Sequence, residues 1–537
     1  MWISHSQRPL QVDELCHALA VEIGSTDLDA DNVPLALTIL GSCQGLIVLD
    51  KESSTIRLIH PTLHEYLSNC PELFGSAHST IAEVCLTYLN SRQVKALSLK
   101  ASHDLRGTPL LEYSSIYWGT HAKMGPSDCA KSLALDLFSQ YDKHVSVKIL
   151  LEKGERTFNF ENEQPLFTGL HCASLFGIAE IVTTLIEMRG CDINQGDPTG
   201  ATPLTRAAQN GHEGVVKLLL ERGDVNPDEP DEEGRTPLAW AARKGHEGVV
   251  RLLLSREDVS PDIPDKYYGQ TPLSWASEMG HEEVVKLLLE REDVTPDQPD
   301  EEGRTPLSWA AENGYEEVVK LILGREDVNP DRPDEEDWTP LLRVARKGHE
   351  GVAKLLMERG DVNPDRPDEG GRTPLSWAAQ NGNDRVAKLL LERKDVNPNV
   401  PDQEGRTPLS WAARNGSGGA VKLLLEREDA NPNKPDQEGR TPLLWAARKG
   451  HAGAAELLLG RGDVDPNSPD RRDQTPLLWA ARNGHVGVVK LLLERGDINP
   501  DKPDKQGRTA SVWAAVEKHC EILDLLHAGQ PTTPSTI

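Results

Sequence analysis

The chain repeats itself every 34 residues, and this internal period limits its fold more than any other feature. The stretch GRTPLSWAAQNG at positions 371–382 returns as GRTPLSWAARNG at 405–416, and the two copies differ only at Gln380 and Arg414. Self-similarity at a period of this size predicts a repeat array, because each unit can bury its apolar surface only against neighbouring units. An array also suits a chain of 537 residues, which exceeds the usual size of one core.

The triplet TPL occurs nine times at this spacing, with a weaker copy before the series and an eroded copy after it. One interval is 35 residues long, because a second tyrosine lengthens the loop DKYYGQ. We therefore expect eleven units, which start near Thr168, Thr202, Thr236, Thr271, Thr305, Thr339, Thr373, Thr407, Thr441, Thr475 and Thr509.

One unit, residues 236–270, indicates two helices and a loop. Thr236 is a favourable helix N-cap, Pro237 suits the first helical turn, and Gly245 supplies the left-handed residue that ends a helix. A second helix is expected over EGVVRLLLS, because its apolar residues recur on one face. The two prolines of VSPDIPD then predict an extended loop. In the preceding unit we expect Leu220 to lie in the core.

The order helix, turn, helix and extended loop, with the pattern TPL…AA..GH..VV.LLL, resembles the ankyrin repeat from about Phe167 to Gly529. The resemblance implies a mostly α-helical solenoid of about 11 repeats, whose first helices and loop tips line a continuous concave face. Two features depart from the family pattern. The histidine that usually follows TPL survives only as His171, and the loop is one residue longer than in the common unit.

Two columns of the repeat vary between copies while their neighbours are nearly constant. The first lies near the end of the first helix, and the second lies between two fixed prolines of the loop. Because both columns change between opposite charges and apolar residues, we interpret them as partner-binding positions of the concave face; drift at unconstrained surface positions is the alternative. The predicted contact residues are Arg243, Glu278, Glu312, Arg346, Gln380, Arg414, Arg448 and Arg482 in the first column, and Ile263, Arg332, Arg366 and Lys434 in the second.

A third column holds mostly tryptophan. One interpretation is a packed ladder between neighbouring first helices, and the other is a partly exposed aromatic edge that a partner contacts, since tryptophan favours protein interfaces. Under the second interpretation Trp309 and Trp411 are predicted contact residues. The column consists of Trp240, Trp275, Trp309, Trp377, Trp411, Trp445, Trp479 and Trp513, interrupted by Arg206 and Arg343.

Composition excludes several classes of function. The 58 lysines and arginines face 85 acidic residues, which gives a net charge of −27, so we expect no direct binding of nucleic acid. No apolar run approaches the ~20 residues that span a bilayer, and the amino terminus does not read as a signal peptide. The eight cysteines form no CxxC pair, which is typical of reduced thiols. We therefore predict a cytoplasmic or nuclear protein without a membrane partner.

Motifs that would carry catalysis are absent or incomplete. HEGVV at 212–216 begins like the zinc-protease motif HExxH, but valine occupies the second ligand position. His60 and His64 have the spacing of a metal pair but no third ligand nearby. RGD at Arg222 and in three sister units is interpreted as a helix end, and no GxxxxGK phosphate loop occurs. We predict no enzyme activity, cofactor, catalytic residue, metal site or small-molecule substrate.

The first 160 residues carry no repeat. Arg8–Gly24 is expected to be a helix with Pro9 near its start, and Leu110–Ala122 another. Between them, CQGLIVLDKESSTIRLIHPTLHEYLSN predicts a strand, a turn, a strand and a helix, which together suggest a winged helix. The expected domains are a winged-helix-like α+β module at 1–75, a helical linker at 76–160, the ankyrin array at 161–529 and a disordered tail at 530–537.

This region resembles the segment between the NACHT domain and the repeats of fungal NOD-like receptors. The resemblance implies a regulatory winged helix, and we expect the family's NTPase domain to be absent, in a short relative or through a missing upstream exon. The matching residues are Trp2, Arg8, Pro9, Leu10, Glu14, Leu15, Cys43, Gly45, Leu46, Asp50, His60, Thr62, Glu65, Tyr66, Leu67 and 111–122. Positions 1–167 hold 13 basic and 20 acidic side chains, and this net charge of −7 argues against DNA binding.

Two functions are consistent with these features. The first is a non-enzymatic scaffold or adaptor that binds a protein on the concave ankyrin face, as a receptor-like sensor related to fungal NOD-like receptors. The alternative is a transcription co-regulator that acts through a DNA-binding partner.

Overall fold

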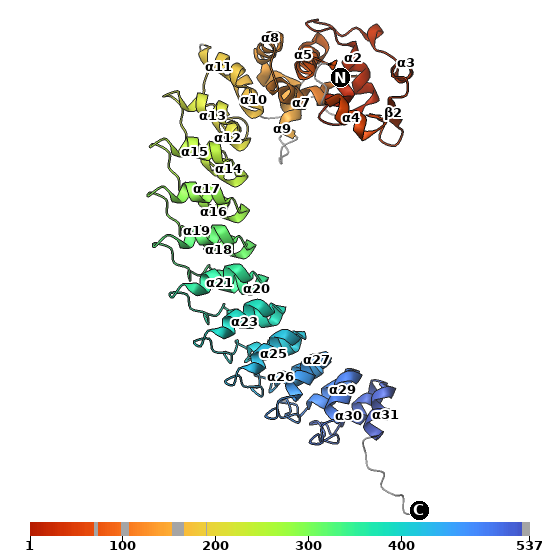
Figure 1. Cartoon of the computed structure of the whole chain (residues 1–537), viewed down its shortest axis with the longest axis vertical. Coiled ribbons are helices and arrows are strands. Elements are labelled where there is room, and N and C mark those ends of the chain that lie inside the picture. Colours follow the sequence, from red (N-terminus) through yellow and green to blue (C-terminus); the bar gives the residue numbers. More distant parts are fainter. Residues whose placement is uncertain (69–72, 98–106, 153–165, 189–190, 529–537) are drawn as a thin grey trace, which may run out of the picture. The chain divides into compact units, whose positions relative to one another are not determined.

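The computed structural model describes residues 1–68, 73–97, 107–152, 166–188 and 191–528 (Figure 1). Its internal contacts divide the chain into two compact units, Met1–Tyr267 and Tyr268–Ile537. Within the described ranges, no helix is long and apolar enough to cross a membrane. The seven cysteines in these ranges are free thiols, while Cys70 and the expected tail at 530–537 lie outside the described residues.

A small antiparallel sheet with short helices around it begins the first unit. The strand order is β1-β3-β2, and Ile56 of the central strand pairs with Leu10 on one side and Leu49 on the other. The predicted strand, turn, strand and helix are confirmed. The elements are α1 (Trp2–His5), β1 (Leu10–Gln11), α2 (Val12–Ala20), η1 (Ala30–Asn32), α3 (Ala36–Ser42), β2 (Ile47–Asp50), β3 (Thr55–Leu58) and α4 (Pro61–Ser68).

The bounds of the helix expected from Arg8 to Gly24 are wrong, because α2 covers only Val12–Ala20. Leu10 instead joins the sheet and is buried there. The carboxylate of Glu14 accepts a hydrogen bond from the Gln11 N–H at 2.8 Å and forms an ion pair with Arg8 at 2.6 Å. Glu14 thereby satisfies a free N–H at the start of α2 and fixes where that helix begins.

Helices without a repeat pattern link the sheet to the first ankyrin repeat. They are α5 (Ala77–Asn90), α6 (Arg92–Lys95), α7 (Leu111–Lys123), α8 (Asp128–Phe138), η3 (Tyr141–Lys143) and α9 (Val145–Glu152). The helix predicted at Leu110–Ala122 is therefore confirmed as α7. α5 packs against α7 and α8, and the fully buried Trp118 contacts Phe138 and Phe176 edge-on or tilted. The domain limits at positions 75 and 160 stay predictions.

Each repeat consists of two antiparallel helices followed by a loop. The first unit contains α10 (Gly169–Phe176), α11 (Ala179–Glu187), α12 (Pro203–Gln209), α13 (Glu213–Leu220), α14 (Pro237–Lys244) and α15 (Glu247–Leu254). The second unit contains α16 (Pro272–Met279), α17 (Glu282–Leu289), α18 (Pro306–Asn313), α19 (Glu316–Leu323), α20 (Pro340–Lys347), α21 (Glu350–Glu358), α22 (Pro374–Asn381), α23 (Asp384–Glu392), α24 (Pro408–Asn415), α25 (Gly418–Glu426), α26 (Pro442–Lys449), α27 (Ala452–Leu459), α28 (Pro476–Arg482), α29 (Val486–Leu493), α30 (Ala510–Val516) and α31 (Cys520–Ala528). Figure 1 shows the helix pairs following one another within each unit.

The helix boundaries follow the expected signals. The Thr305 hydroxyl accepts a hydrogen bond from the Ser308 N–H at 3.2 Å, and Pro306 occupies the first turn of α18. Gly314 ends α18 with a φ of 80°, a conformation that is costly for side chains with a Cβ. Lys518 takes this position in the last repeat with a φ of 64°, a left-handed conformation that is costly for a residue with a Cβ.

Apolar packing between repeats forms the core. First helices pack on first helices and second helices on second helices, as in the pairs α22 and α24 or α23 and α25. The alanines of the first helices are buried, as the close approach of these helices requires, except for the exposed Ala515 of the last repeat. The expectation for Leu220 is wrong, because Leu220 is half-buried whereas its neighbour Leu219 has no exposed surface.

Arginines at the ends of the second helices tie successive repeats together. Arg495 Nη1 donates to the Leu459 carbonyl of the preceding repeat at 2.8 Å, and Arg495 Nε donates to Asp497 at 3.0 Å. The same pair of contacts recurs at Arg256, Arg325, Arg359, Arg393, Arg427 and Arg461. The RGD and RED triplets are therefore helix ends that join repeats, as predicted.

One loop position holds either asparagine or aspartate along the array, and we call it the loop Asx column. It contains Asn194, then Asp228, Asp262, Asp297, Asp331 and Asp365, then Asn399, Asn433 and Asn467, and finally Asp501. Asn399 uses both ends of its amide: Oδ1 accepts the Asn431 N–H at 2.7 Å, and Nδ2 donates to the Asp429 carbonyl at 2.6 Å. Asn433 and Asn467 repeat this arrangement with their following loops. The amide therefore satisfies two backbone groups of the next repeat.

An aspartate in this column can accept the N–H of the following loop, but it has no N–H group to donate to the carbonyl of that loop. Asp365 Oδ2 accepts the Asn397 N–H at 2.8 Å, while no described residue donates a hydrogen bond to its buried Oδ1; Asp297 behaves in the same way with Asn329. Burial raises the pKa of both carboxyl groups, although the N–H that each accepts opposes this shift. An ionised carboxylate at this site therefore costs stability that an amide or a protonated carboxyl would recover.

We expect the double substitution D297N/D365N to raise the urea midpoint of unfolding at pH 7. Each amide gains a donor for the next loop, and one hydrogen bond contributes about 0.5–1.5 kcal/mol. Because the pKa is raised, each wild-type carboxyl binds its proton at a higher pH in the folded state than in the unfolded state. Their destabilisation is thus present at high pH and is lost as the pH falls toward ~4, where the advantage of the variant should shrink.

The matched control is E301Q/E335Q, which removes the same charge at two exposed glutamates of the second unit. In this control, the change of the urea midpoint between pH 7 and lower pH should stay close to that of the wild type. A D297N/D365N midpoint at or below the wild-type value at pH 7 would contradict the assignment.

Candidate functional site

The tryptophan column is anchored by hydrogen bonds to the preceding loop. Trp411 Nε1 donates to Asp402 Oδ2 at 3.0 Å, and the ring is 7% exposed. Equivalent bonds of 2.9–3.1 Å join Trp240 to Asp231, Trp309 to Asp300, Trp377 to Asp368, Trp445 to Asp436, Trp479 to Asp470 and Trp513 to Asp504. These bonds favour the packed-ladder interpretation, although Trp309 and Trp479 are half-buried and keep an exposed edge.

A fixed arginine lies beside six of these seven rings, while Gln474 takes that position beside Trp479. The guanidinium of Arg406 lies 4.1 Å from the centre of the Trp411 ring, and Arg406 Nε donates to Asp402 at 2.9 Å. Arg235, Arg304, Arg372, Arg440 and Arg508 occupy the same place beside their own tryptophans at 3.8–4.5 Å. These residues were not among the predicted contacts, because their constancy in GRTPL indicated the frame of the repeat rather than its surface.

The variable arginines of the first column lie between successive rings. Arg414 is 4.9 Å from the centre of Trp411 and 4.8 Å from that of Trp445 in the next repeat. Arg448 bridges Trp445 and Trp479 at 5.3 and 4.5 Å, and Arg482 bridges Trp479 and Trp513 at 5.3 and 4.0 Å. We call this alternating series the arginine–tryptophan ladder; its members are Trp411, Arg414, Trp445, Arg448, Trp479, Arg482 and Trp513.

The ladder arginines carry charge without a paired acid. Among the described residues, no ion pair within 4 Å involves Arg414, Arg448 or Arg482, all of which are half-buried. Burial lowers the pKa of Arg414 and Arg448, and neighbouring arginines lower it further. Each guanidinium is therefore held between two rings while its cationic edge remains available to an anion.

The other predicted residues of the first column have different surroundings. Glu312 forms ion pairs with Arg343 and Lys347, and Glu278 accepts a hydrogen bond from Gln270 at 2.9 Å. Arg346 lies near two rings, Trp338 and Trp377, at 5.3 and 5.7 Å. Gln380 is half-buried, and Arg243 of the first unit lies 5.6 Å from Trp240. The column is thus acidic at α16 and α18 and basic at α24, α26 and α28.

The basic residues predicted in the loop column donate hydrogen bonds to the preceding loop. Arg332 Nη1 donates to the Asp297 carbonyl at 3.1 Å, Arg366 Nη1 to the Asp331 carbonyl at 3.2 Å, and Lys434 Nζ to the Asn399 carbonyl at 2.9 Å. Ile263 of the first unit is half-buried. These donors already have partners within the array, which leaves the first column as the better candidate site.

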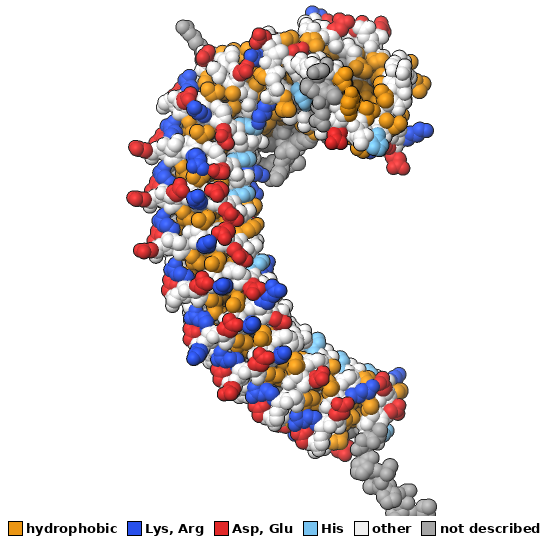
Figure 2. All heavy atoms as spheres, viewed as in Figure 1, with side chains coloured by type: hydrophobic (Ala, Val, Ile, Leu, Met, Phe, Trp, Pro, Cys, Tyr) orange, Lys and Arg blue, Asp and Glu red, His pale blue; other side chains and the backbone are white. Residues whose placement is uncertain are grey.

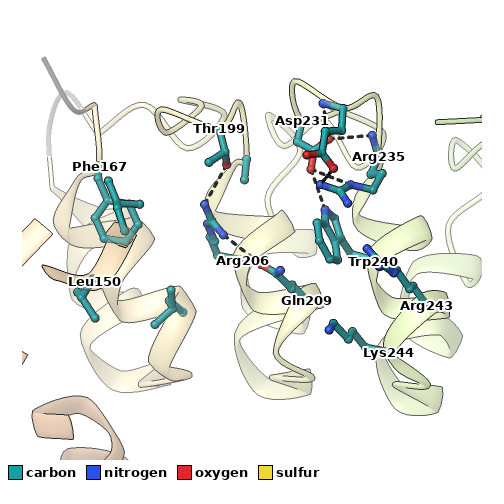
Figure 3. Close-up of a pocket in the computed structure, with 14 residues that line it drawn as sticks. Leu150, Phe167, Thr199, Arg206, Gln209, Asp231, Arg235, Trp240, Arg243 and Lys244 are labelled. Atoms are coloured by element: carbon teal, nitrogen blue, oxygen red, sulfur yellow. Dashed lines mark hydrogen bonds and ion pairs between the residues drawn. The ribbon is translucent and has the colours of Figure 1, made fainter. Parts of the chain in front are cut away.

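A pocket of about 280 Å³ opens between first helices and loops of the first unit (Figure 3). Arg206 stands there in place of the tryptophan, and it donates to Asp197 at 2.7 Å and to Thr199 at 2.9 Å. Figure 3 shows Trp240 beside Asp231 and Arg235 on the next repeat. An arginine at the tryptophan position therefore preserves the bond to the loop aspartate.

A second pocket, of about 320 Å³, lies at α18 and α20 in the second unit. Its lining is rich in carboxylates, among them Glu302, Glu312, Glu335 and Glu336. In the described parts of the chain, no group of three or more His, Cys, Asp or Glu side chains is arranged to hold a metal ion.

Comparison with known families accounts for nearly all of the repeats. The family model for ankyrin repeats matches residues 170–265, 257–334, 326–402, 394–470 and 456–534. The chain belongs to the ankyrin repeat family. The repeat-array fold predicted from the 34-residue period is therefore confirmed, and such arrays are typically non-enzymatic protein-binding modules.

The model described as "GPI inositol-deacylase, winged helix domain" matches residues 1–79 of this ankyrin protein. The match confirms the expected winged helix and its similarity to the segment that follows a NACHT domain. A search of curated proteins finds no match.

The ladder contacts predict a measurable role in stability. Each of the guanidiniums of Arg414, Arg448 and Arg482 lies within 5.3 Å of two ring centres. A cation–π contact at a partly exposed site contributes about 0.5–1 kcal/mol. We therefore expect R448Q to lower the urea midpoint, and R448K to lower it less, because lysine keeps the charge without the planar group. R385Q, at an exposed arginine of α23, is the control; an R448Q midpoint equal to that of R385Q would contradict the contact.

Proposed function

We propose that this ankyrin protein is a non-enzymatic adaptor that binds a protein partner through the arginine–tryptophan ladder of its second unit. The observation that carries the proposal is a row of half-buried guanidiniums that lie between tryptophan rings and lack a paired acid. Tryptophan and arginine are the residues most enriched at the energetic centres of protein interfaces. The remaining predicted residues of the first column in the second unit, Glu278, Glu312, Arg346 and Gln380, belong to the same proposed surface, and Arg243 of the first unit is proposed as a separate contact residue.

The outer surface of the array supports this choice by contrast. Figure 2 shows basic and acidic side chains interleaved over the visible face of the second unit. On the second helices, exposed lysines such as Lys388 and Lys490 lie near Glu392 and Glu521. Mixed charges of this kind favour solubility, whereas a row of one sign with aromatic walls favours a specific partner.

The post-NACHT type of winged helix supports a finer proposal. A winged helix followed by ankyrin repeats is the order of segments in the fungal NOD-like receptors that the sequence resembles, so we propose a receptor-like sensor that recognises its partner with the repeats. The net charge of −7 over 1–167 disfavours contact with DNA. A role as transcription co-regulator would therefore require a DNA-binding partner.

The proposal is tested by affinity capture with the full-length chain from lysate, followed by mass spectrometry. The variant R414E/R448E/R482E should lose the proteins that the wild type retains, because three cationic edges become acidic. The matched control K354E/K388E/K422E makes the same charge change at exposed positions of the second helices and should retain them.

Stability is checked in parallel, because the ladder arginines also contact the rings. The variant R414K/R448K/R482K keeps the charge and should keep most of the captured protein. Retention of the same proteins by R414E/R448E/R482E would contradict the proposed site.

A further inference from the structure

Charge is segregated along the second unit. At the end of the first helix the column changes from Glu278 and Glu312, through Arg346 and Gln380, to Arg414, Arg448 and Arg482. The exposed loop tips stay acidic through Glu369, Glu404 and Glu438 and become basic at Arg471, Arg472 and Lys505. Both positions are therefore basic together at the end of the array, in a chain whose net charge is −27.

The basic charge of the fixed arginines is already offset, whereas that of the ladder arginines is not. Arg406, Arg440 and Arg508 form ion pairs with Asp402, Asp436 and Asp504 at 2.8–3.0 Å. The ladder arginines have rings on both sides instead of an acid. Because these guanidiniums form no ion pair among the described residues, their N–H groups can donate to a carboxylate of a partner.

Spacing restricts the conformation of an anionic partner. Packed helices lie about 8–10 Å apart, so the arginines of α24, α26 and α28 recur at about that interval. A polyproline II segment has three residues per turn and rises about 3.1 Å per residue, which places every third side chain on one side at about 9 Å. The two periods agree to within the scatter of helix packing.

We propose that the arginine–tryptophan ladder binds an extended acidic peptide, with a carboxylate at every third residue and one such residue for each of Arg414, Arg448 and Arg482. This inference rests on the proposed function and names the chemistry of its partner. The exposed edge of the half-buried Trp479 contacts the residues between the carboxylates. At α16 the same position of the repeat holds Glu278, which disfavours an acidic stretch there.

The test uses fluorescence anisotropy of labelled peptides with the full-length chain. The probe is a peptide of about 12 residues made of repeated Glu-Pro-Pro triplets, which is extended in solution. A peptide of the same composition with its glutamates adjacent, and a Gln-Pro-Pro peptide, are the controls for spacing and charge. We expect the Glu-Pro-Pro peptide to bind at least about tenfold more tightly than either control, with affinity that falls as salt increases.

Variants locate the binding. R414E/R448E/R482E should weaken the Glu-Pro-Pro peptide by at least about tenfold, and K354E/K388E/K422E should not. Equal binding of the spaced and clustered peptides, or tighter binding of single-stranded DNA than of the peptide, would overturn the inference.

The two proposals fail differently. If the ladder variant loses captured proteins but the wild type binds no acidic peptide, the inference on partner chemistry is wrong while the proposed function stands. If the ladder variant still captures the same proteins, the proposed function itself is wrong.

Discussion

A buried aspartate at each loop tip is the group on which both the repeat and the candidate site depend. Asp402 Oδ1 accepts the N–H groups of Glu404 and Arg406, and its Oδ2 accepts from Trp411 and from the Arg406 side chain. The carboxylate is 5% exposed and has four hydrogen bonds, so its burial is compensated. The same aspartate therefore shapes the loop and orients the tryptophan on which the ladder arginine lies.

This arrangement explains how one set of arginines can stabilise and bind at once. Arg406 is held by an acid and a ring, and it belongs to the frame. Arg448 is held by two rings alone, so its charge is not neutralised when the repeats pack. A partner that supplies carboxylates would relieve the repulsion among neighbouring arginines, which gives the ladder a reason to prefer anions over neutral ligands.

Much of the fold could be predicted from the sequence, because the same helix-capping and helix-ending residues recur in nearly every repeat. Thr305, Pro306 and Gly314 act through local backbone chemistry, and such signals are readable without a structure. Leu10 could not be assigned in this way, because its place in a strand depends on pairing with the distant Ile56. Variability drew attention to Arg414, Arg448 and Arg482, yet it could not separate them from Arg332, whose donor is used by the neighbouring loop. The constant Arg406 was not predicted as a contact residue because its constancy indicated a structural role, and it contacts Asp402 and Trp411 of its own repeat.

The most direct test of the ladder observes the tryptophan indole N–H groups by NMR in the full-length chain labelled at tryptophan. Titration with an acidic peptide that has a carboxylate at every third residue should shift the signals of Trp445 and Trp479, which border the ladder arginines, and leave Trp309 of the acidic half unchanged. Shifts confined to Trp309, or equal shifts throughout the column, would contradict the central claim that unpaired arginines between rings form the binding site.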